Sequence, residues 1–588
     1  MEKKSNNIAV LETDTHKSIT YQELKIKVEN LMCILIEFGV HKGDKVGIYL
    51  PKGSNQIVAV LAILGIGACY VPIGVNQALQ RMRGMLLKAN IKTIISDENG
   101  KKYLQENVQQ NIVLVNAKNA VKSSCDTMPD STERSAYIIF TSGTTGEPKG
   151  VEISHRSAWN TINEVNKICC VDEHSKILSV SALEFDLSVY DIFGILSEGG
   201  TVVVTSENAR RDAAVWANAI MDYNITVWNS VPYLLNMLLT VAETEGKVFP
   251  SLKKVILSGD WIGLDLPERL KRIAPNAEML AMGGATEAAI WSNFIQVQLP
   301  LPSKWVSIPY GKPLAGQLYR VVDQAGKDCP NWVSGELWIG GDGVAKGYIS
   351  DDLLTEEKFV YENGIRWYKT GDMGRFWPDG TIEFLGRKDT QVKIRGHRIE
   401  MGEIESILNQ YPGIISSVVD VVGIKESKKI YAYIISRQKK LDFKSIEQFL
   451  KSYLPEYMIP SKFVMGEKIP LSLNGKVERS YVSRILEENL NVESVDYEEP
   501  IGTTETTISL IWKKVLKIEK LSRNDDFFEV GGDSLKAVSI MSQLKQKNLV
   551  PINTSVQILF TNSTIKKFAE QVNRLNMEEN QETEIDTI

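Results

Sequence analysis

YIIFTSGTTGEPKG, at residues 137–150, joins an apolar stretch typical of a buried strand to a loop of small and hydroxylated residues. Small residues let backbone N–H groups approach phosphate oxygens, hydroxyl groups add donors, and a lysine supplies compensating charge. The loop is not a Walker loop, because its lysine is followed by glycine rather than by serine or threonine. The segment predicts a polyphosphate site at the end of a strand, formed by Thr141, Ser142, Gly143, Thr144, Thr145 and Lys149.

An alternation of strand-like and helix-like sequence extends to both sides of this segment. Short β-branched runs such as KVGIYL (45–50) and TVVVTS (201–206) alternate with stretches of helical period as far as about residue 385. This alternation predicts an α/β fold with largely buried sheets. After GRKD (386–389) a shorter run carries its own strands and helices, which predicts a small α+β unit. We therefore expect a large N-terminal subdomain at 1–388 and a small C-terminal subdomain at 389–485.

The C-terminal part of the chain has a different pattern of charged and apolar residues. Residues 486–503 are acidic and almost free of apolar periodicity, as expected for a solvated linker. Apolar residues at helical spacing then predict a compact four-helix bundle at 504–575. We expect the polar tail at 576–588 to be disordered.

The composition excludes several classes of protein. The chain has 588 residues, of which 43% are hydrophobic, so it should divide into several domains. Its net charge is −6 and its basic residues are scattered, which argues against nucleic acid and membrane surfaces as partners. Its six cysteines include no CxxC pair, which argues against a disulfide framework and a zinc site. With no signal core and no apolar run of the roughly 20 residues that a bilayer span needs, we expect a cytoplasmic protein.

Four more motifs follow the phosphate loop in order. They are GGATEAAIW (283–291), YKTGDMGRFWPDG (368–380), GRKDTQVKIRGHRIEMGEIE (386–405) and PLSLNGKVER (470–479). Together the five motifs resemble those of the adenylate-forming (ANL) superfamily, specifically the adenylation domains of nonribosomal peptide synthetases, over about residues 18–485. The resemblance implies the ANL fold, ATP and Mg²⁺ as cofactors, and an amino-acid adenylating ligase.

The resemblance also implies roles for individual residues. Glu287 would bind Mg²⁺, Asp372 would accept the ribose hydroxyls, and Arg387 would help to hold ribose and phosphate. Lys476 would be the catalytic lysine that bridges the substrate carboxylate and the α-phosphate, where negative charge builds in the transition state. Asp389 would be the hinge about which the small subdomain swings, exchanging the loop of Lys476 for a loop around Gly396. Further ATP-binding residues would be Gly283, Gly284 and Thr286.

The adenine region departs from the usual motif. Most relatives carry Tyr-Gly-Pro where this chain has Gly283, Gly284 and Ala285, so the expected aromatic stack on adenine is missing. A similar Gly-Gly-Ala-Thr-Glu occurs in the subfamily that activates cysteine for thiazoline formation. We interpret the change as a feature of that lineage, and it leaves the mode of adenine binding open.

The motif DDFFEVGGDSLKAVSIM (525–541) places Ser534 after Gly-Gly-Asp at the start of a helical pattern. It resembles the attachment motif of peptidyl carrier domains, which implies 4′-phosphopantetheine on Ser534, added by a phosphopantetheinyl transferase. A flexible linker to a site in the same chain gives the thiol a high effective concentration. We therefore expect loading within one chain.

The segment ALEFDLSVYDIFG (182–194) resembles the motif whose aspartate, here Asp186, pairs with the α-ammonium group of an amino acid. The other pocket residues, aligned by their flanking motifs, are similar to those of cysteine-activating domains. The expected substrate is L-cysteine, with L-serine or another small amino acid as alternatives, because the pocket would be narrow and mildly polar. The aligned residues are Leu187, Tyr190, Asn229, Ile256, Ser258, Met282, Ile290 and Trp291.

Two other classes fit less well. An acyl-CoA ligase would share the ATP motifs but should lack Asp186 and the carrier serine, and an inactive scaffold should have lost Lys476, Glu287 or Asp372. The sequence shows no recognisable condensation, cyclisation or thioesterase segment. We therefore expect the thioester to serve a condensation or heterocyclisation domain in trans or upstream, in antibiotic or siderophore biosynthesis, with an MbtH-like protein as a possible activating partner.

Overall fold

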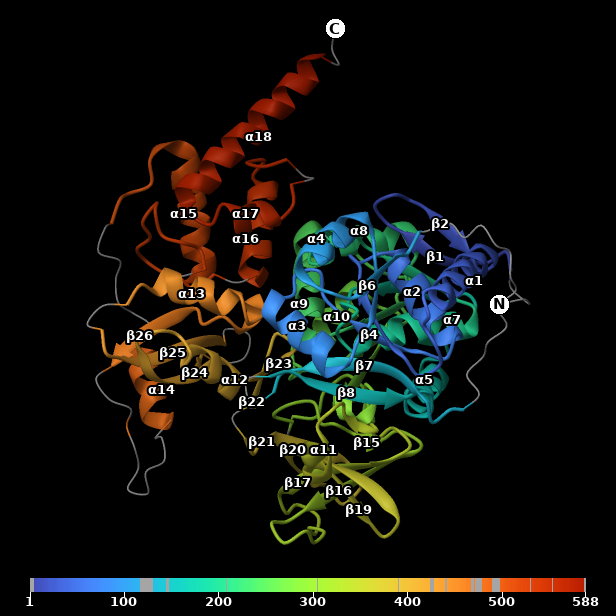
Figure 1. The fold of residues 1–588 in the computed structure, drawn as a ribbon. Helices are drawn as coiled ribbons and strands as arrows, with labels where there is room; N and C mark the ends of the chain where they lie inside the picture. The colour runs from blue at the N-terminus through green and yellow to red at the C-terminus, as the bar shows by residue number, and fades with distance from the viewer. Residues whose placement is uncertain are drawn as a thin grey trace.

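A large α/β body, a small α+β subdomain and a helical bundle make up the computed structural model (Figure 1). The bundle lies above the small subdomain, and the large body lies beside both. The structure describes residues 5–116, 131–143, 147–207, 209–303, 305–389, 391–423, 428–438, 441–466, 470, 479–488, 497–528, 530–532, 534–551 and 554–585.

The first sheet of the large body has the strand order β18-β8-β7-β4-β3-β5-β6. Its central strands are parallel and almost completely buried, as their β-branched runs predict. The predicted phosphate loop joins β7 to the antiparallel β8. The strands are β3 (Lys45–Tyr49), β4 (Cys69–Pro72), β5 (Thr93–Ser96), β6 (Asn111–Leu114), β7 (Ser135–Thr141), β8 (Lys149–Ser154) and β18 (Gly347–Tyr348), with α2 (Ser54–Gly65), α3 (Leu79–Lys88) and α4 (Glu98–Asn107).

The second sheet has the order β15-β14-β13-β12-β11-β9-β10-β1-β2 and is parallel from β1 to β13. Its strands are β1 (Ile8–Glu12), β2 (Ser18–Thr20), β9 (Lys176–Ser179), β10 (Thr201–Val204), β11 (Val227–Ser230), β12 (Lys254–Leu257), β13 (Glu278–Gly283), β14 (Asn293–Val297) and β15 (Lys312–Pro313). The helices of this part are α1 (Tyr21–Glu37), α5 (His155–Cys169), α6 (Leu187–Val189), η2 (Tyr190–Gly194), α7 (Ile195–Glu198), α8 (Ala213–Tyr223), α9 (Pro232–Glu245), α10 (Leu266–Ile273) and η3 (Thr286–Ala288).

Side-chain caps fix the ends of several of these helices. Thr20 and Glu23 form a capping box at the start of α1, and Ser154 caps α5 directly after β8. Because α5 starts where β8 ends, the capped helix begins at the end of the β7–β8 pair opposite the phosphate loop, where Ser154 pairs with Ser135.

A third, antiparallel sheet lies below the other two in Figure 1. It has the order β16-β17-β20-β19, with β21 paired to β20, and its register places Asp372 opposite Arg387. The elements are β16 (Gln317–Val322), β17 (Gly335–Gly341), α11 (Asp352–Lys358), β19 (Phe359–Glu362), β20 (Ile365–Phe376) and β21 (Ile382–Arg387).

The small subdomain combines a hairpin with a three-stranded sheet. The hairpin is β22 (Gln391–Ile394) and β23 (His397–Glu400), and the sheet has the order β24-β25-β26. Its last helix ends at Glu488, past the expected boundary at 485. The other elements are α12 (Met401–Leu408), β24 (Ile414–Val422), β25 (Lys429–Ser436), α13 (Phe443–Lys451), η5 (Glu456–Met458), β26 (Lys462–Gly466) and α14 (Arg479–Glu488).

The C-terminal bundle contains four helices within its described residues. They are α15 (Gly502–Leu516), α16 (Ser534–Gln546), α17 (Gln557–Thr561) and α18 (Ile565–Ile585). The prediction of disorder from 576 onward was wrong for 576–585, because α18 continues through them. Good helix formers and the lack of proline or glycine let the helix extend beyond the bundle core. No helix in the described part of the chain is both long and apolar enough to cross a membrane.

Candidate functional site

A cavity of about 60 Å³ lies where the hairpin of the small subdomain meets the large body. Residues from five separate stretches of the sequence line it together. Four of the predicted motifs are represented, so the fold gathers at one place many of the side chains that the sequence singled out. The cavity is lined by Phe185, Asp186, Leu187, Ser258, Gly259, Gly284, Ala285, Thr286, Ile290, Trp291, Thr370, Asp372, Arg387, Gln391, Lys393, Gly396 and Arg398.

Asp186 provides the buried negative charge of this cavity. It directly precedes α6, and its carboxylate accepts a 2.7 Å hydrogen bond from the Thr286 hydroxyl. Burial raises the pKa of Asp186 to about 6, against the lowering effect of that hydrogen bond. A carboxylate held in this way is best stabilised by a bound cation, as an α-ammonium group would be.

The end of the cavity is closed by aromatic and polar side chains. The rings of Tyr190 and Trp291 meet edge to face with centroids 5.1 Å apart, and the Trp291 indole donates a 2.8 Å hydrogen bond to the Ser258 hydroxyl. Leu187, Ser258, Ile290 and Trp291, all predicted pocket residues, line the cavity.

Three other predicted pocket residues lie behind this wall. Tyr190, Asn229 and Ile256 are fully buried and do not belong to the described lining. The Asn229 amide donates a 2.7 Å hydrogen bond to Asp191, a carboxyl group whose pKa is raised to about 7 by burial. These residues support the wall of the pocket in this conformation. Met282 lies on the adjoining cavity instead.

That adjoining cavity has a volume of about 310 Å³. Gly283, Gly284 and Arg387 line it together with Tyr310 and Phe384, whose rings stack at 5.2 Å. A Cβ atom added at Gly283 would lie 3.1 Å from the Tyr310 ring and 2.8 Å from the Asn293 side chain. The Tyr310 ring therefore occupies space close to where a tyrosine at 283 would project.

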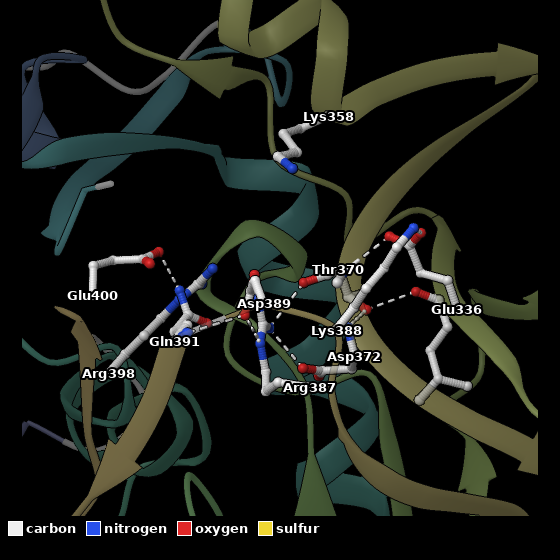
Figure 2. Close-up of polar contacts among 12 residues, drawn as sticks. Glu336, Lys358, Thr370, Asp372, Arg387, Lys388, Asp389, Gln391, Arg398 and Glu400 are labelled. Atoms are coloured by element: carbon white, nitrogen blue, oxygen red, sulfur yellow. Dashed lines mark hydrogen bonds and ion pairs between the residues drawn. The ribbon is translucent and has the colours of Figure 1, made fainter. Parts of the chain in front are cut away.

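Arg387 joins the two predicted acidic residues beside this cavity, as Figure 2 shows. Its guanidinium donates to Asp372 at 2.6 Å and to both oxygens of Asp389 at 2.9 and 2.5 Å. Burial alone would raise the pKa of Asp389, but the hydrogen bonds and charge of Arg387 hold it below its usual value. The predicted hinge residue is thus tied to the predicted ribose-binding pair.

Glu287 is completely buried, and Arg398 of β23 is its charged partner. The Arg398 guanidinium donates to the two Glu287 oxygens at 2.8 and 3.1 Å, and the Tyr348 hydroxyl donates at 2.8 Å. Burial would raise the pKa of Glu287, but the arginine charge outweighs it and lowers the pKa to about 2. The predicted metal ligand Glu287 is therefore ionised, and the positive charge of Arg398 on the hairpin balances its negative charge.

The phosphate loop also contacts the small subdomain. The Ser142 hydroxyl donates to the Arg398 carbonyl at 2.7 Å, and the Gly143 N–H donates to the Glu403 carboxylate at 3.0 Å. The Lys149 ammonium lies 3.6 Å from Glu400. The groups of this loop that are suited to bind phosphate oxygens therefore interact with the hairpin β22–β23 and with α12, the helix that follows it. Thr141 ends β7, whereas Thr144, Thr145 and Lys476 lie outside the described residues.

The turn of the hairpin reaches the edge of the smaller cavity. Gly396 adopts a left-handed conformation with φ +84°, and its N–H donates to Asp260 at 3.1 Å. A Cβ at this position would lie 2.4 Å from a Val231 methyl group. Only glycine fits this close approach without displacement.

The helical bundle contacts the large body next to this turn. The N–H of Leu535, one residue after Ser534, donates to the Tyr233 hydroxyl at 3.1 Å. At the other end of α16, Gln546 donates to the Thr244 carbonyl at 3.0 Å. The helix α16 therefore runs alongside α9, with its Ser534 end beside the hairpin (Figure 1).

Sequence analysis missed three side chains of this region. Arg398 stands inside the motif KIRGHRIE, so the basic residue after its glycine could have been singled out. Tyr310 belongs to none of the quoted motifs, and Tyr233 lies in an apolar helical pattern that predicts only core packing. Only the tertiary contacts bring these two tyrosines to the site.

Comparison with known proteins matches two parts of the chain to protein families. Residues 1–349 match the AMP-binding enzyme family, and residues 506–572 match the phosphopantetheine attachment site. The anguibactin system regulator of Vibrio anguillarum is 42% identical over 595 residues, covering 100% of this chain and 56% of the relative. Pyochelin synthetase PchE of Pseudomonas aeruginosa is 45% identical over 406 residues, covering 69% of this chain and 28% of the relative.

A solved structure has the same fold. It is a holo nonribosomal peptide synthetase protein containing adenylation and PCP domains, with a TM-score of 0.80 and 24% identity, over 98% of this chain and 95% of that one. This likeness confirms the predicted adenylate-forming fold followed by a helical carrier domain. With the family match over more than half of its length, the chain belongs to the AMP-binding enzymes and carries a phosphopantetheine attachment domain at its C-terminal end.

Proposed function

We propose that this chain uses ATP to activate an amino acid as its acyl-adenylate and then loads the acyl group as a thioester onto phosphopantetheine at Ser534. The observation that carries the proposal is the position of Asp186. Its buried carboxylate shares one cavity with Asp372 and Arg387, and the helix that begins at Ser534 starts beside that cavity's hairpin.

ATP would bind across the two adjoining cavities. The larger cavity would take adenine, with Tyr310 supplying the aromatic surface that position 283 lacks. Asp372 would accept the ribose hydroxyls beside Arg387, and the loop residues from Thr141 to Lys149, together with Gly284 and Thr286, would face the phosphates. This arrangement accounts for the glycine-rich departure from the usual adenine motif.

Mg²⁺ fits the donor set around Glu287. The described residues contain no group of three or more His, Cys, Asp or Glu side chains that could hold a metal alone, so Glu287 would share the ion with ATP phosphates. When the hairpin is withdrawn, a bound Mg²⁺ would supply the positive charge that Arg398 gives the buried Glu287 carboxylate in this conformation. Bound Mg²⁺ would neutralise charge on the leaving pyrophosphate.

In the first step a substrate carboxylate oxygen forms a bond to the α-phosphorus, and the bond to pyrophosphate breaks. Lys476 would stabilise the negative charge of this transition state. The carboxylate needs no general base because it is already ionised at neutral pH. In the second step the thiolate forms a bond to the acyl carbon, and AMP leaves as the mixed anhydride breaks.

We infer that the structure corresponds to the second step. The hairpin with Gly396 lies at the cavity, Arg398 pairs with Glu287, and the phosphate loop bonds to the small subdomain. Arg398 occupies the carboxylate that would hold Mg²⁺, so this arrangement fits a state in which no ion is bound at Glu287. A swing about Asp389 would bring the hairpin in.

The proposed substrate is L-cysteine, with L-serine or another small amino acid as the alternative. A short, polar side chain suits the cavity because Trp291, which packs on the buried Tyr190, and Ser258 both line it. Amino-acid-dependent ATP–pyrophosphate exchange across the proteinogenic amino acids tests this assignment. The best exchange is expected with cysteine, and a best signal from a large or charged amino acid would contradict the proposal.

The proposed partners follow from the chemistry. A phosphopantetheinyl transferase would modify Ser534, and a condensation or heterocyclisation domain would consume the thioester on the way to an antibiotic or siderophore. An MbtH-like protein could assist folding or activity. Because the chain spans 56% of the length of the anguibactin system regulator, the full assembly's activity is part of this proposal.

A further inference from the structure

Tyr233, the second residue of α9, contacts two parts of the molecule at once. It is buried in the large body. Its ring meets the hairpin of the small subdomain, and its hydroxyl meets the carrier helix. No other part of the proposed mechanism uses this residue.

The hairpin side of the contact is a cation–π interaction. The guanidinium carbon of Arg395 lies 5.6 Å from the centroid of the Tyr233 ring. Arg395 immediately precedes Gly396, whose turn packs against Val231 two residues before the tyrosine. The residues at the start of α9 therefore contact both Arg395 and Gly396 of the hairpin turn.

The carrier side is a hydrogen bond at the start of a helix. The first N–H groups of a helix have no partner within it, and the Tyr233 hydroxyl accepts the one from Leu535 at 3.1 Å. Leu535 follows Ser534 directly, so this bond fixes the end of α16 that carries the attachment residue. A shift of this end would move the arm relative to the cavity.

Within the described residues, the other hydrogen bonds between the carrier and the rest of the chain each reach one part only. Gln546 with Thr244, and Ser555 with Asp212 at 2.9 Å, join the carrier only to the large body. Lys429 with Phe528, at 2.7 Å, joins it only to the small subdomain. Tyr233 joins all three parts.

We propose that Tyr233 is a positioning residue that couples insertion of the hairpin to docking of the carrier domain, an inference that rests on the proposed thioester-forming function. When the hairpin is in place, Arg395 holds the tyrosine ring, and the hydroxyl is held where it can accept from Leu535. When the hairpin swings out, the tyrosine ring loses its contact with Arg395. The Tyr233 hydroxyl, which accepts from Leu535 at the start of α16, is then less well positioned. The carrier thus docks preferentially after the adenylate has formed.

The test uses the full-length holo chain and separates the two steps. Y233F keeps the ring and removes the hydroxyl, so loading of the activated amino acid onto Ser534 in a single turnover should slow about fivefold, the effect of one lost hydrogen bond. ATP–pyrophosphate exchange should stay at the wild-type rate. Y361F, which alters an exposed tyrosine on β19, is the matched control and should change neither rate.

A double-mutant cycle tests the coupling itself. Y233L and R395Q each remove the cation–π contact, so the double variant should load no more slowly than Y233L alone. Effects that multiply independently, or loading by Y233F at the wild-type rate, would overturn the proposal. Equal losses of exchange and loading in Y233F would also overturn it, by assigning Tyr233 a general structural role. Absence of exchange in the wild-type chain with every amino acid would instead refute the proposed function.

Discussion

At the scale of single residues, the central group is the Asp186 carboxylate. Its pKa is raised to about 6 by burial, so it is mostly ionised at pH 7.5 and becomes protonated as the pH falls through about 6. Only the ionised form can pair with an α-ammonium group. If Asp186 binds the α-ammonium group as proposed, we expect amino-acid binding to require near-neutral or higher pH.

D186N is expected to raise the KM for the amino acid about a hundredfold, because truncating one partner of a buried charge pair costs about 3 kcal/mol. The KM for ATP should change little. In the wild-type protein the amino-acid KM should rise as the pH falls below about 6, and D186N should lose this pH dependence. Exchange kinetics at several pH values check both effects, with the exposed D222N as control. An unchanged amino-acid KM in D186N would exclude the ammonium-binding role.

Tyr310 is the second decisive residue at this scale. If its ring stacks on adenine, Y310L should raise the KM for ATP about tenfold, since base–aromatic stacking contributes about 1–3 kcal/mol. The KM for the amino acid should remain close to its wild-type value, because Tyr310 lines only the larger of the two cavities. Initial-rate exchange with each substrate varied in turn measures the two constants. A selective rise in the amino-acid KM would place adenine elsewhere.

At the scale of elements, the hairpin β22–β23 brings both Gly396 and Arg398 to the cavity. Its register pairs Ile394 with His397 across the turn, so the turn residues project from the small subdomain toward α9. If the hairpin inserts as proposed, Arg398 and the turn would reach the cavity together. Blocking the turn should affect the step that uses the hairpin and spare the step that uses the loop of Lys476.

G396A should therefore slow thioester loading at least tenfold and leave ATP–pyrophosphate exchange nearly unchanged, an order-of-magnitude expectation for overpacking a tight contact. The added Cβ would lie 2.4 Å from Val231 and would also strain the left-handed backbone. G380A is a matched control, because Gly380 has φ +81° but open space around its Cβ. Parallel single-turnover loading and exchange assays measure the two steps. Equal losses in both assays would show that the hairpin serves adenylation as well.

Sequence patterns predicted the strands and helices well where a segment is dominated by one pattern, either a β-branched run or a helical spacing of apolar residues. The β-branched runs at 45–50 and 201–206 form buried parallel strands, and the helical pattern at 504–575 forms a bundle. The tail at 576–585 was mispredicted, because low hydrophobicity was taken as disorder although the residues favour helix continuation from α18. The family resemblance implied that the loop around Gly396 reaches the site, but its individual contacts could not be read from sequence because they depend on how two subdomains meet.

The candidate site was predicted unevenly for a related reason. Asp186, Asp372, Arg387 and Glu287 lie in local motifs, and the structure brings them to one place. Tyr190, Asn229 and Ile256 are fully buried behind the cavity wall, a distinction of a few ångströms that alignment of motifs does not contain. The pairing of Glu287 with Arg398 reflects one conformation of the small subdomain and has no sequence pattern of its own.

At the scale of the whole molecule, three parts meet around the proposed reaction centre. The large body holds the cavities, the small subdomain supplies the hairpin, and the carrier presents the Ser534 end of α16 beside the turn (Figure 1). Asp389, the proposed hinge residue, accepts hydrogen bonds from Arg387, so the position of the subdomain is linked to the proposed ribose-binding pair. This arrangement would let one chain perform both proposed steps without moving the adenylate between sites.

Intact-mass spectrometry of the holo chain tests this account most directly. After modification by a phosphopantetheinyl transferase, incubation with ATP, Mg²⁺ and L-cysteine should add one cysteinyl group, and S534A should show neither the arm nor the added group. Omission of ATP should abolish the gain. A chain that carries the arm on Ser534 but gains no mass with any proteinogenic amino acid, or an S534A chain that is still loaded, would contradict the account.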